Sequence, residues 1–123
     1  MEIAVWVVSG LLAFAFFAGG VVRLAVPAER YGAWPNQQWI RAVPRGGIVA
    51  ISIAEILGAV GLIVPVLTGV APILTPIAAL GLAAIMAGAF VFHLRRKETP
   101  NLPVALVLIA LLLFVAIARF AGL

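Results

Sequence analysis

Residues 47–65 read GIVAISIAEILGAVGLIVP, an apolar run whose one ionisable residue is Glu55. A transmembrane helix needs roughly 20 mostly apolar residues to cross a hydrocarbon core of about 30 Å. The run is close to that length, and Pro65 at its end lacks the N–H group that an α-helix requires. It predicts a membrane-spanning helix over about 47–64.

Three more runs of the same kind predict helices over about 3–25, 76–95 and 102–121. Hydrophobic residues make up 66% of the 123 residues and charged residues only 10%, whereas an ordinary soluble domain is about 25% charged. The mean hydropathy is +1.29. The predicted fold is therefore all-α, a polytopic membrane four-helix bundle that forms a single transmembrane domain over residues 1–123.

Small residues and capping residues suggest how these helices begin and pack. Thr75 before Pro76, and Asn101 before Pro103, are typical of helix starts, with the polar residue as the N-cap. The spacing of Ala50, Ala54 and Gly58, and of Ala84 and Gly88, gives small faces on which helices approach closely. Such faces also permit a homo-oligomer.

The basic residues lie at the ends of the apolar runs and predict the orientation. Four follow the first span and three follow the third, whereas the opposite side carries only Arg119. The seven are Arg23, Arg30, Arg41, Arg45, Arg95, Arg96 and Lys97. The positive-inside rule places both of these connections in the cytoplasm and both termini outside a bacterial-type plasma membrane. The net charge of +4 is thus expected to face membrane lipids, and no nucleic acid is expected as a partner.

Residues 26–46 form the longest connection and carry side chains that prefer the headgroup region. The interfacial candidates among them are Trp34, Trp39, Arg41 and Arg45. One interpretation is a segment that lies in the membrane interface or folds back over the helix ends. The alternative is a plain solvated loop.

Glu55 is the most informative residue of the chain. It lies about nine residues into its helix, roughly 13 Å deep at 1.5 Å per residue. A charged carboxylate at that depth is costly, so the side chain should face the bundle and be neutral or paired. Two roles remain open: a buried structural glutamate, or a glutamate that handles protons or contacts a ligand.

Arg23, His93 and Arg119 complete the candidate intramembrane polar site with Glu55. Arg23 either extends to lipid phosphates or turns inward, His93 is either an interfacial cap or a ligand contact, and Arg119 is equally ambiguous. We expect Glu55, Arg23 and His93 to share one interior region open toward the cytoplasmic side.

Other chemistries find no support. The absence of cysteine excludes disulfides and thiolate chemistry, and a single histidine makes no specific metal site, so no metal is expected. Ser9 and Ser52 do not stand in a nucleophile elbow.

The order of these motifs resembles the DoxX-like family. The resemblance rests on the runs 20–24, 55–65, 74–82 and 89–93, and on Arg95, Arg96 and Arg119. It implies small four-helix membrane proteins of mostly unassigned function, with relatives that are subunits of a thiosulfate:quinone oxidoreductase or assist receptor assembly. The family's acidic, basic and histidine positions would correspond to Glu55, Arg23 and His93. Ser52 departs from the glycine usual there, and lysine is commoner than Arg23.

Two functions follow as hypotheses. The first is an accessory or assembly subunit for a membrane partner, with a quinone-linked redox enzyme as the case that the resemblance implies. The alternative is a membrane-embedded enzyme or binder of a small hydrophobic molecule, such as a quinone or a lipid, held by the Glu, Arg and His side chains.

Overall fold

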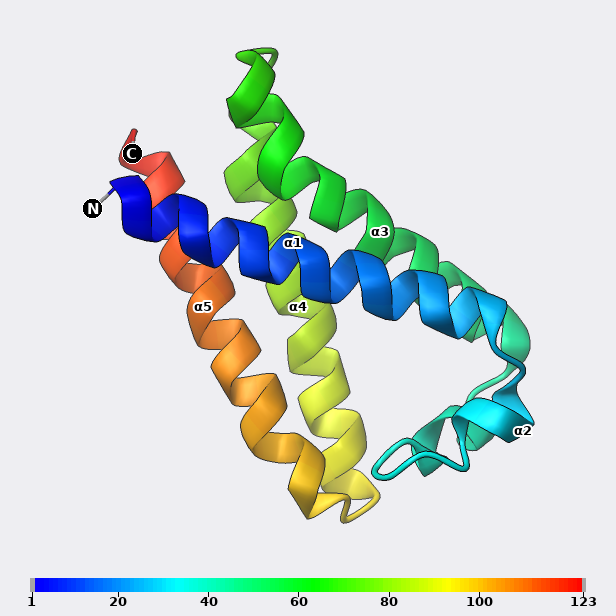
Figure 1. The fold of residues 1–123 in the computed structure, drawn as a ribbon. Coiled ribbons are helices and arrows are strands. Elements are labelled where there is room, and N and C mark those ends of the chain that lie inside the picture. The colour runs from blue at the N-terminus through cyan, green and yellow to red at the C-terminus, as the bar shows by residue number, and fades with distance from the viewer. Residues whose placement is uncertain (1, 123) are drawn as a thin grey trace.

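The computed structural model describes residues 2–122 and confirms the all-α fold. Four long helices account for most of the chain: α1 (Glu2–Ala25), α3 (Arg45–Thr68), α4 (Leu74–Arg95) and α5 (Leu102–Phe120) (Figure 1). Three short elements connect them, and these are α2 (Ala28–Tyr31), the 3-10 turn η1 (Gln38–Ala42) and the 3-10 turn η2 (Thr99–Asn101). Each long helix belongs to a stretch long and apolar enough to cross a membrane.

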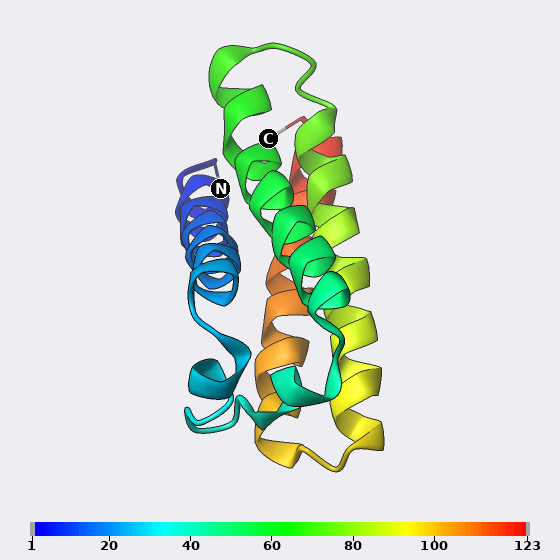
Figure 2. The same cartoon turned by 90° about the vertical axis from the view of Figure 1, so that its right-hand side faces the viewer.

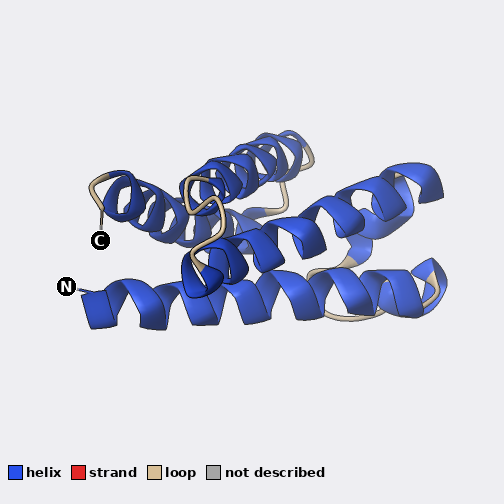
Figure 3. Ribbon diagram, turned by 90° about the horizontal axis from the view of Figure 1, so that it is seen from above, coloured by secondary structure: helices blue, strands red, loops and turns tan. Residues whose placement is uncertain are grey.

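The long helices form two pairs. Helix α1 packs along α3, and α4 packs along α5 (Figures 1 and 3). The pairs meet near the chain termini and separate toward the end that carries α2 and the α4–α5 turn (Figures 1 and 2). The two pairs thus form a wedge that is open at this end, and the segment between α1 and α3 crosses the opening.

The main core lies where the two pairs meet. Its buried side chains include Leu12 and Phe16 of α1, Leu62 of α3, Leu82 of α4 and Leu112 of α5. Many large apolar side chains instead point outward, among them Phe14 at 75% exposure and Ile117 at 69%. An apolar exterior around a small core suits contact with lipid.

Helix α3 is longer than the sequence indicated, since it continues through Pro65 to Thr68. Proline at position 65 removes the N–H that would bond to the carbonyl of Gly61. In the structure, Oγ1 of Thr75 donates to that carbonyl at 2.8 Å. A side chain from the next helix therefore satisfies the backbone group that the proline leaves open, and the helix does not end.

The predicted capping role of Thr75 is wrong, and that of Asn101 is correct in position only. Helix α4 begins before Thr75, with Ile73 at the N-cap and no side-chain capping bond. Asn101 does occupy the N-cap of α5, but its side chain makes no capping bond there. Its Nδ2 instead donates to the carbonyl of Asn36 at 3.2 Å, which ties the open end of the wedge together.

Replacing Thr75 by valine should destabilise the protein by about 1–3 kcal/mol, because the Gly61 carbonyl would then lack a partner. In a Pro65→Ala background residue 65 regains its N–H, so the same Thr75→Val change should cost about 1 kcal/mol less. Thermal unfolding of the four variants in detergent measures this coupling. An equal cost of Thr75→Val in both backgrounds would contradict the account.

Close helix contacts occur at only some of the expected small residues. A Cβ added at Gly58 would lie 2.7 Å from the side chain of Leu82, so α3 and α4 pack tightly there. Gly20 was not among the predicted small residues, but a Cβ built there would lie 2.8 Å from the carbonyl oxygen of Ser52, so α1 also packs closely against α3. Gly88 differs, because a Cβ built there meets nothing within 4 Å.

The segment 26–44 folds back over the helix ends rather than forming a plain solvated loop. Ile40 is 1% exposed and packs with Tyr31 and Ile48 in a second small core. The guanidinium of Arg45 donates to the carbonyls of Arg23 and Leu24 at 3.2 and 3.0 Å. These bonds satisfy carbonyls at the C-terminal end of α1, where a cation is also favoured by the helix dipole.

Candidate functional site

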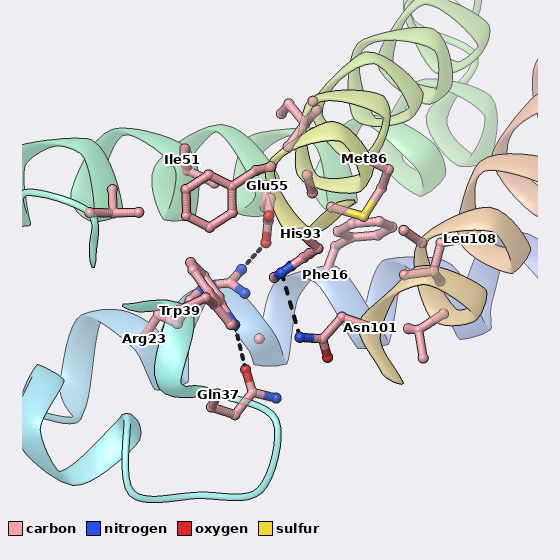
Figure 4. A pocket seen from close by; sticks show the side chains of 18 of the residues that line it. Phe16, Arg23, Gln37, Trp39, Ile51, Glu55, Met86, His93, Asn101 and Leu108 are labelled. Carbon is pink, nitrogen blue, oxygen red and sulfur yellow. Dashed lines mark hydrogen bonds and ion pairs between the residues drawn. The ribbon is translucent and has the colours of Figure 1, made fainter. Parts of the chain in front are cut away.

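A cavity of about 710 Å³ occupies the wedge between the two helix pairs (Figure 4). All four long helices line it, and residues of the segment 26–44 border it at the open end. Most lining side chains are apolar, as expected inside a membrane protein. The polar lining residues are Arg23, Gln37, Glu55, Trp39, His93 and Asn101.

Arg23 and Glu55 form an ion pair on the α1–α3 wall of the cavity (Figure 4). Glu55 is buried, with 3% exposure, and the Arg23 side chain turns inward rather than toward the headgroups. Nε of Arg23 also lies 3.5 Å from Oγ of Ser52, one helical turn before Glu55. The guanidinium folds back over Gly19, where an added Cβ would lie 3.7 Å from Nη2, an ordinary van der Waals contact.

The ion pair offsets the energetic cost of burying the Glu55 carboxylate. An isolated charge at membrane depth carries a large desolvation penalty, whereas a paired and hydrogen-bonded charge recovers most of it. Arginine is well suited to this role because its planar group keeps its charge and offers five N–H donors. Two of its donors contact Glu55 and Ser52, so donors remain for a molecule in the cavity.

His93 lies on the α4 wall in a second polar cluster. Its Nδ1 is 2.8 Å from Oε1 of Glu98, and Nε of Arg96 donates to the same oxygen at 3.1 Å. Nδ2 of Asn101 is 3.5 Å from Nδ1. The ring of Trp39 meets the imidazole edge-on, with 5.8 Å between centroids.

The local backbone explains why Glu98 reaches His93. Helix α4 ends in a Schellman motif, in which the Lys97 N–H bonds to the carbonyl of Leu94 and the Glu98 N–H bonds to the carbonyl of His93. Lys97 takes the left-handed conformation that this motif needs, with φ of 58°. The chain therefore reverses and places the Glu98 carboxylate beside the imidazole.

The predicted interfacial residues divide into two groups. Trp39 turns inward, lines the cavity and donates from Nε1 to Oε1 of Gln37 at 2.9 Å. Trp34 is 40% exposed outside the cavity. Arg41 and Arg45 are exposed and bond to backbone carbonyls, Arg41 to that of Glu29 at 2.7 Å. The two arginines hold the segment in place and do not line the cavity.

Arg119 lies apart from the other three candidate residues. Its guanidinium stacks on the ring of Trp6, 4.9 Å from the ring centroid. Both residues belong to the end of the bundle where the chain termini lie (Figure 1). The cavity between the helix pairs is instead lined by Glu55, Arg23 and His93.

Sequence reasoning missed Glu98, Asn101 and Gln37 as members of the site. A carboxylate five residues after a histidine at a helix end is a weak signal, because its position depends on the turn geometry. Among residues 2–122 no group of three or more His, Cys, Asp or Glu side chains could hold a metal ion. What the arrangement offers is an apolar space with hydrogen-bonding groups on two facing walls.

Four membrane-length apolar helices around a cavity with an internal arginine–glutamate pair define a small multi-pass membrane protein. Residues 7–115 match the model of the DoxX-like family, and the chain belongs to that family. No curated protein and no solved structure matches the chain.

Proposed function

We propose that the protein binds a small hydrophobic molecule with one polar end inside the bilayer. The observation that carries this proposal is the cavity, whose volume of about 710 Å³ lies within the range of about 300–1,000 Å³ typical of ligand sites. Its composition supports the same conclusion, because mostly apolar walls with a few converging polar groups are what such sites contain.

The polar residues indicate where the ligand head lies. Arg23 and His93 are both near the ends of their helices, so the head sits toward the open end of the wedge. The apolar walls formed by Phe16, Ile85 and Leu108 then receive the hydrophobic part of the molecule. Quinones and lipids both have this division into a polar head and an apolar body.

Purification of the protein in a mild detergent, followed by extraction and mass spectrometry, tests the proposal. We expect one amphiphile enriched well above its share of the bulk membrane lipid. A bound fraction with the composition of the bulk lipid would argue against a specific ligand.

A second candidate function is an accessory or assembly subunit for another membrane protein, including a quinone-linked redox enzyme. The observation that favours it is Gly81 of α4, which is exposed, does not line the cavity and has no chain atom within 4 Å of a Cβ built there. Small residues on a lipid-facing surface let another transmembrane helix approach closely. A partner or a second copy that remains bound in mild detergent, and is displaced by Gly81→Leu, would support this function.

The orientation that we propose has the open end of the cavity in the cytoplasm and both termini outside. Its support is the basic excess on the two connections at that end. Because the chain has no cysteine, single-cysteine variants report topology directly. Ala33→Cys should react with a membrane-impermeant thiol reagent only after the membrane is opened, whereas Val70→Cys should react in intact cells. Equal reaction of both in intact cells would reject the orientation.

These two positions suit the experiment because both are exposed. Asn36 and Gly69 lie in the same connections, but their φ values of 64° and 74° disfavour a cysteine.

A further inference from the structure

The two facing walls of the cavity differ in their hydrogen-bonding character. Arg23 is a donor only, since a guanidinium has no acceptor atom. His93 can be either a donor or an acceptor, depending on which ring nitrogen carries the proton. The partner of Nδ1 therefore decides what the histidine presents to a ligand.

Glu98 determines that choice. Its Oε1 accepts from Nε of Arg96, so this oxygen acts as an acceptor in the cluster. The 2.8 Å contact with Nδ1 then requires the proton on Nδ1. Asn101 competes for the same nitrogen from a longer 3.5 Å, so the bond to Glu98 dominates.

Nε2, the other ring nitrogen of His93, remains available to a molecule in the cavity. In residues 2–122 Nε2 of His93 makes no hydrogen bond, and the imidazole lines the cavity wall. With Nδ1 protonated, Nε2 of the neutral ring carries a lone pair and accepts a hydrogen bond. The cavity thus offers the Arg23 guanidinium as a donor on one wall and Nε2 of His93 as an acceptor on the other.

We propose that Glu98 is a positioning residue that fixes the tautomer of His93, and that the cavity consequently selects a ligand whose head carries a hydroxyl group. A hydroxyl donates its hydrogen to Nε2 and accepts through its oxygen, so it meets the demands of both walls. A head with acceptors only, such as an ether or a ketone, would leave Nε2 without a partner. The selectivity part of this proposal rests on the proposed binding function, whereas the tautomer part does not.

Nitrogen-15 NMR tests the tautomer, because His93 is the one histidine of the chain and a histidine-labelled sample reports on it alone. At alkaline pH, where imidazole is neutral, we expect a protonated Nδ1 and a non-protonated Nε2. Glu98→Ala should move the proton toward Nε2, and Glu98→Gln, whose amide oxygen still accepts, should preserve much of the original state. Glu29→Gln, at an exposed acid of the same end, is the matched control and should change nothing.

A protonated Nε2 in the unmodified protein, or a spectrum that Glu98→Ala does not alter, would overturn the positioning role. Neither result depends on any ligand being bound.

Para-nonylphenol and its methyl ether test the selectivity, since they differ in the hydroxyl hydrogen and one methyl group. We expect the phenol to bind roughly tenfold more tightly, the effect of about one net hydrogen bond. His93→Phe should remove that preference, while Glu29→Gln should retain it. Equal binding of the two probes would overturn the hydroxyl preference and leave the binding function standing. Binding of neither probe, with the tautomer as expected, would count against the binding function itself.

Discussion

Replacing Glu55 by leucine is expected to destabilise the protein by about 3 kcal/mol, because the substitution leaves the guanidinium of Arg23 buried without its counter-ion. The side chains of the pair are only 13% and 4% exposed, so water compensates only in part for the lost carboxylate. Glu55→Gln should cost less, since the amide oxygen still accepts a hydrogen bond from Arg23. Thermal unfolding in detergent measures both changes.

The double variant Arg23→Met, Glu55→Leu separates the cost of the unpaired charge from the cost of altered packing. Replacement of a whole buried ion pair by apolar side chains is often neutral or stabilising, so the double variant should regain a stability within about 1 kcal/mol of the unmodified protein. It should nevertheless fail to bind the ligand, because the donors on that wall are gone.

Glu29→Leu is the control for the loss of an acidic residue, because Glu29 is exposed in α2 at the open end of the wedge. Its effect on stability should stay within about 0.5 kcal/mol. A single Glu55→Leu variant as stable as the unmodified protein would show that the ion pair does not hold α1 to α3. A double variant as unstable as the single one would assign the loss to packing.

Filling the cavity at Gly88 should weaken ligand binding strongly without loss of stability. Gly88 lines the cavity, and a Cβ added there meets nothing within 4 Å. A phenylalanine at this position takes up part of the space that the ligand needs, so we expect the affinity to fall more than tenfold. The protein itself should remain as stable or gain up to about 1 kcal/mol, since glycine is among the poorest helix formers.

Gly81→Phe is the matched control for this experiment. Gly81 lies on the same helix, is exposed and also has nothing within 4 Å of an added Cβ, but it does not line the cavity. The gain in helix propensity should therefore be the same and the affinity unchanged. Equal affinities of the Gly88→Phe variant and the unmodified protein would place the ligand outside this cavity.

The sequence alone predicted the fold class, because a membrane span is decided within one segment. Each helix needs enough consecutive apolar residues and internal backbone hydrogen bonds, and neither requirement depends on the neighbouring helices. The same reasoning singled out Glu55, since a carboxylate within an apolar run needs a partner wherever the other helices lie.

Helix ends were less predictable, as α3 shows. Pro65 predicts a stop in any isolated helix. The helix nevertheless continues, because Thr75, ten residues later, donates to the carbonyl that the proline leaves open. This hydrogen bond exists only after α3 and α4 have packed against each other.

Which polar residues line the cavity was also decided by the packing of the helices against one another. Arg23 and Arg119 are both arginines near a helix end, and their surroundings in the sequence do not distinguish them. The packing of α1 on α3 at Gly20 turns Arg23 toward Glu55, while Arg119 stacks on Trp6 at the other end of the bundle. Glu98 reaches His93 only because a left-handed residue reverses the chain after α4. Segment hydrophobicity determines that the four helices enter the membrane, whereas the rotation of each helix about its axis, set by close contacts between side chains, decides which polar groups meet inside it.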